Sequence, residues 1–299
     1  MNLMKELRMI DGTLLSQIKS YISGAIVNVE QIKKGYVNDV FLVHSTHCKY
    51  IVKCFTIFDN SKIDNSIALQ KFLAERGIAP TVISEGACGV RYIIQEYVGS
   101  GNVNQDWFLF GKTLALMHNC LKCFEAIDIN DYSFPSISII PCDKERAWEF
   151  KELISLKNKI EKKTHTPEID GKQIIHGDYT WNNIVEKDAK YQVIDYDEAK
   201  KYYRIYDVAK VVFGQAPFDS NAWEKAQEFI RGYQYVSPIQ AQEKSEFLNI
   251  YAYTLMKDYS GLEGKPNKDV YYLSKRIEKH KNALKFLDDS FDISRRLGW

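Results

Sequence analysis

The pattern of apolar and polar positions changes about a third of the way along the chain. Before that point, short runs rich in β-branched and aromatic residues alternate with turns, which predicts strands. These runs are GAIVNVEQIKKG (24–35), DVFLVHS (39–45), KYIVKCF (49–55), PTVIS (80–84) and VRYIIQEYV (90–98). One segment among them, SIALQKFLAERG (66–77), has apolar residues at helical spacing and ends at Gly77, which favours a helix end. We therefore predict a mostly antiparallel sheet interrupted by one helix.

Helical spacing dominates after Gly99. The predicted helices are QDWFLFGKTLALMHNCL (105–121), DKERAWEFKELISLKNKIEKK (143–163), the segment after Ser237-Pro238, and DVYYLSKRIEKHKNALKFLDD (269–289). Strand-like pieces interrupt this helical part near residues 174 and 192. The fold class predicted from these patterns is α+β, with a small β-rich N-terminal lobe (1–98) and a larger, mainly helical C-terminal lobe (99–299).

The interrupting stretch, IIHGDYTWNNIVEKDAKYQVIDYDEAK (174–200), crowds acidic side chains between strand-like segments. Neighbouring carboxylates repel one another unless a cation lies among them. Asp178 is followed by Asn183 five residues later and by Asp195 twelve residues after that. Phosphoryl transfer needs one carboxylate to accept a proton and further oxygen ligands to hold Mg²⁺, and this spacing fits that need. A polar hairpin with capping Asp and Asn side chains is the structural alternative.

The segments HGDYTWNN and VIDYDEAKKYYRIYDVA together resemble the aminoglycoside phosphotransferase superfamily, which also contains choline and homoserine kinases. The resemblance implies a bilobal, protein-kinase-like fold and ATP-dependent phosphorylation of a hydroxyl group on a small molecule. It implies that Asp178 is the catalytic base and that His176 braces its loop. It also implies that Asn183 and Asp195 are Mg²⁺ ligands, and that Asp207 is structural. ATP is the expected nucleotide, with GTP left open.

The resemblance extends to the predicted sheet. Lys53 matches a strand lysine that contacts the nucleotide phosphates, although an isolated lysine on an alternating strand is usually a surface residue. The turn expected to cover the phosphates contains Gly35, Tyr36, Val37 and Asn38, and a plain β-turn is its alternative. The segment expected to pair with adenine contains Gln95, Glu96, Tyr97 and Val98, where Glu96 is alternatively a solvated linker charge.

The chain departs from the family pattern at one position. The helix after the lysine strand normally carries a Glu that pairs with that lysine, and Ser66 lies near this position. Asp64 is an alternative partner for Lys53 if the helix begins earlier. An unpaired lysine would be oriented less well, which lowers turnover rather than abolishing it.

Two other functions remain alternatives. One is a non-catalytic or weakly active nucleotide-binding member with a structural role, as in the spore-coat branch of the superfamily. The other is a protein kinase, but such an enzyme would carry Asp-Phe-Gly where this chain has Asp195-Tyr196-Asp197. Only eleven residues lie between Asp195 and Asp207, which leaves little room for a peptide platform and favours a small acceptor.

Net charge and cysteine content bear on the expected binding partners and cellular location of the protein. Lys and Arg number 40 and Asp and Glu 39, so no strong field selects a nucleic acid or a membrane surface. With no visible signal or membrane-spanning run, we expect a cytoplasmic protein. The six cysteines do not indicate a disulfide framework, and we expect Cys120 and Cys123, near His118, to be buried thiols rather than zinc ligands, which would also draw on Cys142. Nothing in the sequence indicates an oligomeric state.

Overall fold

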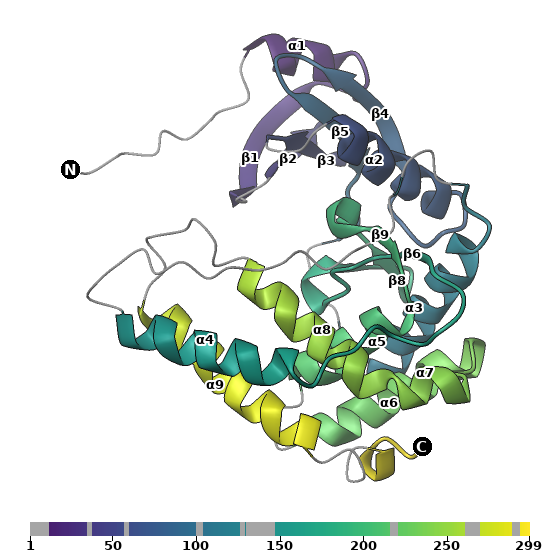
Figure 1. Cartoon of the computed structure of the whole chain (residues 1–299). Helices are drawn as coiled ribbons and strands as arrows, with labels where there is room; N and C mark the ends of the chain where they lie inside the picture. Colours follow the sequence, from purple (N-terminus) through teal and green to yellow (C-terminus); the bar gives the residue numbers. More distant parts are fainter. Residues whose placement is uncertain are drawn as a thin grey trace. The chain divides into compact units, whose positions relative to one another are not determined.

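The computed structural model describes residues 12–34, 38–56, 60–99, 104–125, 129, 147–215, 221–260, 270–288 and 294–299. These residues form two compact units (Figure 1). The first unit draws on Met1–Val103, Phe124–Asp128 and Asn182–Asp197, and the second on Asn104–Cys123, Ile129–Trp181 and Glu198–Trp299. The predicted division into functional lobes at residue 98 remains a prediction.

The first unit is built on a five-stranded antiparallel sheet with the strand order β1-β2-β3-β5-β4. Its strands are β1 (Ile26–Lys34), β2 (Asn38–Ser45), β3 (Lys49–Phe55), β4 (Val82–Ala87) and β5 (Arg91–Glu96). Helix α1 (Gly12–Lys19) precedes the sheet, and α2 (Asn60–Ala74) lies between β3 and β4 in sequence. The predicted antiparallel sheet with one helix is confirmed. Helix α2 begins earlier than the predicted Ser66 because its first turn already buries Ile63.

Alternation along the strands decides which side chains meet α2. On β3, Tyr50, Val52 and Cys54 pack in one core cluster with residues of α1, whereas Phe55 packs with Ile63 and Ile67 of α2. Successive strand residues point to opposite faces, so Lys53 shares the α2 face with Phe55. The sheet therefore places Lys53 beside α2 for geometric reasons.

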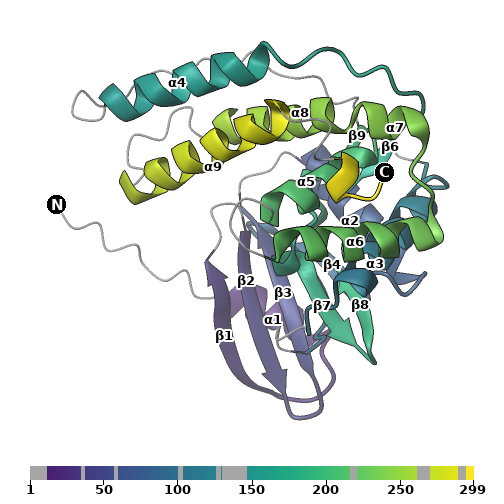
Figure 2. The same cartoon turned by 90° about the horizontal axis from the view of Figure 1, so that it is seen from below.

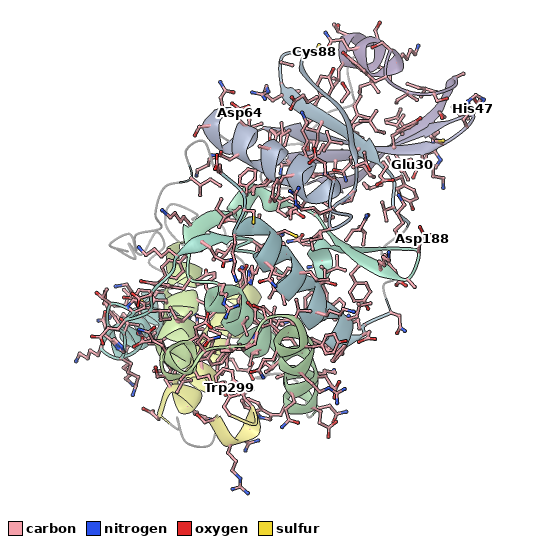
Figure 3. The ribbon with its side chains drawn as sticks, turned by 90° about the vertical axis from the view of Figure 1, so that its right-hand side faces the viewer. Glu30, His47, Asp64, Cys88, Asp188 and Trp299 are labelled. Carbon is pink, nitrogen blue, oxygen red and sulfur yellow. The ribbon has the colours of Figure 1, made fainter. Side chains whose placement is uncertain are left out.

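A hairpin formed far along the chain also belongs to this unit. Strands β7 (Ile184–Lys187) and β8 (Lys190–Val193) are joined by Asp188 and Ala189, both with positive φ, and Figure 3 labels Asp188 at the turn. Such a two-residue turn matches the twist of the strands it connects. The Val193 N–H donates to the Ile78 carbonyl at 2.7 Å, which ties the hairpin to the segment after α2.

The second unit is mainly helical. Its helices are α3 (Trp107–Leu121), α4 (Ala147–Glu161), α5 (Ile205–Gln215), α6 (Ala222–Val236), α7 (Ala241–Ser245), α8 (Phe247–Ser260) and α9 (Val270–Asp288). Strands β6 (Gln173–Ile175) and β9 (Lys200–Tyr202) form a small antiparallel pair. Helices α4 and α9 run side by side in both Figure 1 and Figure 2, consistent with an ion pair between Lys281 and Glu152 at 2.5 Å. Three of the four predicted helical segments are found as α3, α4 and α9, although residues 143–146, 269 and 289 lie outside the described residues. The predicted helix start at Ser237-Pro238 is wrong, because Ser237 is the C-cap of α6 and Gln240 is the N-cap of α7, and α8 follows as a separate helix.

The cysteines and helices of the described ranges bear on two further expectations. Cys120 is half-buried and Cys123 exposed, both as free thiols, so the expectation that both are buried is wrong. No group of three or more His, Cys, Asp or Glu side chains in these ranges is placed to hold a metal ion. Cys142 lies outside them. None of the helices described is both long and apolar enough to cross a bilayer.

Candidate active site

The segment His176–Asp178 follows β6 in the second unit and is fixed by its backbone. Gly177 has φ +77°, and a Cβ there would lie 2.2 Å from the Glu198 carbonyl oxygen, so only glycine fits. The His176 ring is fully buried, and its Nδ1 accepts a hydrogen bond from the Asp178 N–H at 3.1 Å. The loop that carries Asp178 is therefore held from both sides of its glycine.

The carboxylate of Asp207, near the start of α5, accepts hydrogen bonds from the backbone of the same loop. Its Oδ2 accepts from the His176 N–H at 2.9 Å and its Oδ1 from the Gly177 N–H at 2.9 Å. The His118 Nε2 lies 3.1 Å from Oδ2, and the Tyr233 hydroxyl lies 2.9 Å from His118 Nδ1. Since an ionised carboxylate only accepts, Nε2 carries the proton and Tyr233 donates to Nδ1. A series of buried hydrogen bonds, from Tyr233 on α6 through His118 on α3 to Asp207, thus orients the loop.

The electrostatics of this chain favour a charged Asp207. Burial alone would raise the pKa of Asp207, but the hydrogen bond from His118, the electrostatic influence of the His118 and His176 rings, and the Gly177 N–H together lower it below its ordinary value. Burial also raises the pKa of Tyr233, so its hydroxyl stays protonated. His118, expected to be structural, is completely buried in this network.

Lys210 is the functional candidate of the second unit that sequence reasoning missed. Its Nζ donates to the Asp178 Oδ1 at 2.5 Å and to the Gly177 carbonyl at 2.9 Å. The available signal was its position three residues after Asp207 on one helix, a spacing that places both side chains on the same helix face. The ammonium group fixes the orientation of the Asp178 carboxylate.

In the first unit, the open end of the β7–β8 hairpin brings together Asn183 and the residue before Asp195. The Ile194 N–H donates to the Asn183 carbonyl at 3.0 Å, and Ile184 pairs with Val193 in the hairpin. Asp195 follows directly with φ +71°, a strained value for a residue other than glycine. Such strain is concentrated at functional sites, where surrounding contacts maintain it. The hairpin thus gathers an amide and a carboxylate, which were predicted as Mg²⁺ ligands.

Lys53 lies against two carboxylates of this segment. Its Nζ is 3.0 Å from the Asp195 Oδ1 and 2.8 Å from both oxygens of Asp197. Asp197 also accepts from the Ser66 hydroxyl at 2.8 Å and from the Asn38 amide at 2.5 Å. Burial raises the pKa of Asp197, with Lys53 acting in the opposite direction and Asp195 adding to the rise. All five side chains belong to the first unit.

The alternative partner proposed for Lys53 is wrong. Asp64 has an exposed side chain that pairs with Arg91 at 2.7 Å, and Figure 3 labels it on α2. From the sequence alone, Asp197 is only a residue that departs from the Asp-Phe-Gly motif of protein kinases. The signal that could have identified it is its spacing, since it lies two residues after a predicted metal ligand in a chain whose helix lacks the expected Glu.

The oxygen donors of the first unit fit a hard divalent cation. The Asn183 amide and the Asp195 carboxylate supply the ligand types that Mg²⁺ prefers. The Asn38 Oδ1 beside this cluster is a buried acceptor with no hydrogen-bond partner within the described part of the chain. A cation or a bound water would satisfy such an atom.

The residues predicted to surround the nucleotide are partly described. Gly35 and Tyr36, with Val37, lie outside the described residues. Asn38 opens β2, pairs in register with Phe55, and uses its side chain on Asp197.

The residues predicted to meet adenine follow one another at the end of β5. The Gln95 side chain is buried and accepts from Gln70 at 2.7 Å. The Glu96 N–H donates to the Thr81 carbonyl, so it is already used within the sheet. Burial opposes the charge on Glu96, yet hydrogen bonds from Lys187 and Thr81 lower its pKa. Tyr97 and Val98 lie beyond the strand, and Tyr97 has the Lys49 ammonium 5.5 Å from its ring.

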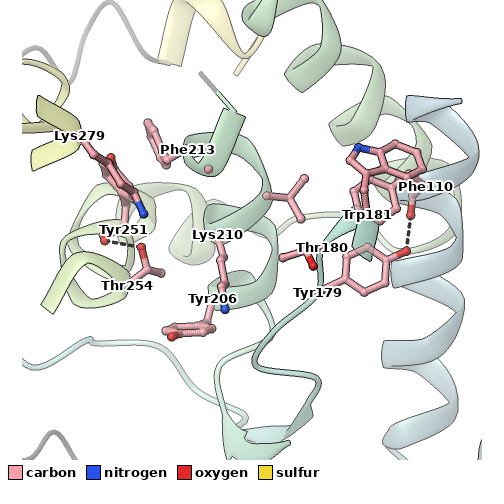
Figure 4. Close-up of a pocket in the computed structure, with 12 residues that line it drawn as sticks. Phe110, Tyr179, Thr180, Trp181, Tyr206, Lys210, Phe213, Tyr251, Thr254 and Lys279 are labelled. Atoms are coloured by element: carbon pink, nitrogen blue, oxygen red, sulfur yellow. Dashed lines mark hydrogen bonds between the residues drawn. The ribbon is translucent and has the colours of Figure 1, made fainter. Parts of the chain in front are cut away.

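A pocket of about 220 Å³ opens in the second unit beside the loop of Asp178 (Figure 4). Lys210 is both a wall of this pocket and the partner of Asp178. The other described lining residues are mostly aromatic and include no carboxylate: Phe110, Tyr179, Thr180, Trp181, Tyr206, Val211, Phe213, Gly214, Tyr251, Thr254 and Lys279. The Tyr179 hydroxyl donates to the Phe110 carbonyl at 2.8 Å, which fixes one wall.

Comparison with known proteins bears on both fold and function. Residues 28–241 match the model of a family described as the phosphotransferase enzyme family. A microcompartment-associated aminopropanol kinase has a similar structure, with a TM-score of 0.64 at 14% identity, covering 96% of this chain and 99% of that one. Spectinomycin phosphotransferase APH(9)-Ia, solved with ADP and spectinomycin, gives 0.63 at 15% identity and covers 95% and 98% of the two chains. Choline kinase from Cryptosporidium parvum Iowa II gives 0.59 at 15% identity and covers 96% and 99%.

These likenesses confirm the predicted α+β, protein-kinase-like fold. No curated protein matches the sequence.

Proposed function

The chain belongs to the phosphotransferase enzyme family and is a small-molecule kinase, and from this premise we propose that it transfers the γ-phosphate of ATP, with Mg²⁺, to a hydroxyl group of a small molecule. The observation that carries this proposal is the fixed loop of the second unit. Buried His176 and Asp207 hold its backbone, and Lys210 holds the Asp178 carboxylate beside a pocket. A polar hairpin without function would not need a carboxylate positioned in this way.

Asp178 is the general base of the proposed reaction. It takes the proton from the acceptor hydroxyl as that oxygen attacks the γ-phosphorus. The new bond joins the acceptor oxygen to the γ-phosphorus. The bond that breaks joins the γ-phosphorus to the β–γ bridging oxygen, which leaves with ADP. His176 and Asp207 keep the loop in place, and Lys210 fixes the direction of the carboxylate.

In this proposal, Lys53, Asn183 and Asp195 bind the nucleotide and its metal ion. Lys53 neutralises phosphate charge that grows during transfer. Asn183 and Asp195 would hold Mg²⁺, which would offset the charge of the phosphates. Two similar structures contain AMP-PNP or ADP, which supports an adenine nucleotide as the donor. GTP remains an alternative donor.

The pocket of the second unit is the proposed acceptor site. Its volume of about 220 Å³ is below the ~300–1,000 Å³ of pockets that take drug-sized ligands, which supports a compact acceptor. Aromatic walls bind a ring or a short carbon chain by apolar contact. Aminoglycosides, amino alcohols and simple sugars are all candidate acceptors, but the described lining offers no carboxylate to bind an amino group.

The test is a screen of ATP consumption against aminoglycosides, choline, ethanolamine, homoserine, methylthioribose and simple sugars. A productive acceptor supports the proposal. Silence across the panel, with tight binding of Mg·ATP retained, would instead support a non-catalytic nucleotide-binding protein with a structural role.

Asp178→Ala is expected to reduce turnover by about 10²–10⁴-fold, the range that a general base contributes. Asp178 is partly exposed, so the thermal unfolding curve should stay close to that of the wild type. Steady-state kinetics with the acceptor found in the screen, together with circular dichroism, measures both. Wild-type turnover in this variant contradicts the assignment.

Asp195→Ala is expected to remove the Mg²⁺-dependent part of nucleotide binding. Calorimetric titration with AMP-PNP, with and without MgCl₂, measures this part directly and needs no acceptor. The matched control is Asp188→Ala at the hairpin turn, which removes an acidic side chain from the same hairpin but not from its ligand end. Equal Mg²⁺ dependence in wild type and Asp195→Ala argues against this residue as a ligand.

A further inference from the structure

The contacts of Lys53 are divided unequally between its two carboxylate partners. Asp197 offers both oxygens at 2.8 Å, whereas Asp195 offers one at 3.0 Å. The Asp197 side chain is 7% exposed, against 29% for Asp195 and 12% for Lys53. Ion pairs gain strength as they leave solvent, so Asp197 is the principal partner of the ammonium group.

Exposure and hydrogen bonding separate the roles of the carboxylates of Asp195 and Asp197. One ammonium, that of Lys53, faces two carboxylates of unequal exposure. A buried carboxylate is stable only when it is paired with a cation and hydrogen-bonded. The Asp197 carboxylate accepts hydrogen bonds from Lys53, Ser66 and Asn38. Asp195 is the more exposed of the two and has the strained backbone. Asp195 is therefore the carboxylate of the two that is more accessible to a divalent cation.

Two elements anchor Asp197. Ser66 comes from α2 and Asn38 from the first residue of β2, and each donates to a different oxygen of the carboxylate. Lys53 comes from β3, which lies next to β2 in the sheet. The carboxylate consequently connects the lysine strand to the helix, although the helix itself offers only a hydroxyl at that point.

Resting on the function proposed above, we propose that Asp197 is the positioning residue of Lys53, fixed by Ser66 and Asn38, and that this arrangement leaves Asp195 to the divalent cation. A serine on α2 and an aspartate after β8 together supply the lysine contact that a single helix carboxylate would supply. Lys53 exchanges Asp195 for nucleotide phosphate when the nucleotide binds, and it keeps Asp197.

The first experiment moves the carboxylate from the loop back to the helix. Ser66 Oγ lies 2.8 Å from the Asp197 Oδ1, which lies 2.8 Å from the lysine, so a glutamate at position 66 can place its carboxylate where Asp197 had been. Binding of Mg·AMP-PNP is measured by calorimetry. Asp197→Ala should weaken it about tenfold or more, the effect expected from loss of a hydrogen bond to a charged group. The double variant Ser66→Glu/Asp197→Ala should recover most of that loss.

Two controls accompany the binding experiment. Asp64→Ala removes another acidic side chain of α2, one that contacts Arg91 rather than Lys53, and should bind Mg·AMP-PNP like the wild type. Adenosine, which has no phosphate, should bind equally to all variants. Wild-type binding of Mg·AMP-PNP by Asp197→Ala overturns the proposal. So does a double variant no better than Asp197→Ala, since a metal ligand or a purely structural residue would not be replaced from the helix.

A second readout needs neither nucleotide nor turnover. The rate at which an acetylating reagent modifies Lys53 in the nucleotide-free protein is followed by mass spectrometry, with exposed Lys285 as the internal reference. Asp197→Ala should raise the relative rate about tenfold, as the ammonium loses its principal partner, and the double variant should restore protection. An unchanged rate overturns the positioning role. If the wild type does not bind Mg·AMP-PNP, the proposed function fails, while the acetylation rates still decide the role of Asp197.

Discussion

At the scale of single residues, Asp207 determines the geometry of the loop that carries Asp178. It is completely buried and accepts hydrogen bonds from two successive backbone N–H groups and from His118. An amide at this position would turn an NH₂ group toward at least one of these donors. The carboxylate therefore serves both the stability of the fold and the placement of Asp178.

Asp207→Asn should lower the free energy of unfolding by about 3 kcal/mol at pH 7, because buried hydrogen bonds to a charged group are lost. The pKa of Asp207 is lower in the folded protein than in the unfolded chain. Its contribution is therefore fully present above the unfolded pKa and is lost as the pH falls through the folded pKa. The difference between wild type and variant should stay constant above about pH 5 and shrink below about pH 4. Urea denaturation across this range measures it, and a difference that grows in acid contradicts the assignment.

At the scale of secondary-structure elements, two glycines allow α3 and α6 to approach closely. A Cβ on Gly111 would lie 1.9 Å from the Phe229 carbonyl oxygen, and one on Gly232 would lie 1.9 Å from the Phe108 carbonyl oxygen. Since α3 carries His118 and α6 carries Tyr233, this close crossing also sets the hydrogen bond between them.

Gly111→Ala should destabilise the protein by about 1–3 kcal/mol, the usual cost of overpacking, because the helix backbones must separate. The matched control is Gly214→Ala on α5, where nothing lies within 4 Å of the added Cβ. That change should raise stability by about 0.5–1 kcal/mol through helix propensity alone. Thermal and urea unfolding of both variants measures the contrast. Equal effects would show that the crossing tolerates a methyl group.

The same open position on α5 tests the acceptor pocket. Gly214 is exposed and lines the pocket, so Gly214→Phe should occupy its space without disturbing the core. The KM for the acceptor should rise about tenfold or more, while binding of Mg·AMP-PNP stays unchanged. Gly214→Ala is the control, and its KM should remain near that of the wild type. An unaltered acceptor KM in Gly214→Phe places the acceptor elsewhere.

At the scale of the whole molecule, nucleotide binding should stabilise the fold only when the divalent cation is present. A ligand at 100 times its Kd adds about 2.7 kcal/mol to the free energy of unfolding. Mg·AMP-PNP should therefore raise the Tm, and EDTA should abolish the increase. Differential scanning fluorimetry with Asp195→Ala as the unresponsive control measures this effect. A Tm increase that survives EDTA contradicts the proposed metal dependence.

The sequence by itself determined the order of elements and the principal motif. Runs rich in β-branched and aromatic residues predicted the sheet, helical spacing predicted helices such as α3, α4 and α9, and the fixed spacing of Asp178, Asn183 and Asp195 pointed to phosphoryl transfer. These features are local, because residue type and spacing within one segment of the chain decide them. The family membership and the fold were predictable for that reason.

Only the tertiary structure decided which side chains meet across the chain. Lys53 finds Asp197 over a separation of 144 residues, and Asp178 finds Lys210 over 32. Asp64, close to the position predicted for the lysine partner, pairs with Arg91 instead. Pattern and propensity report on neighbours along the chain, whereas the partner of a buried charge depends on which faces the folded elements turn toward one another.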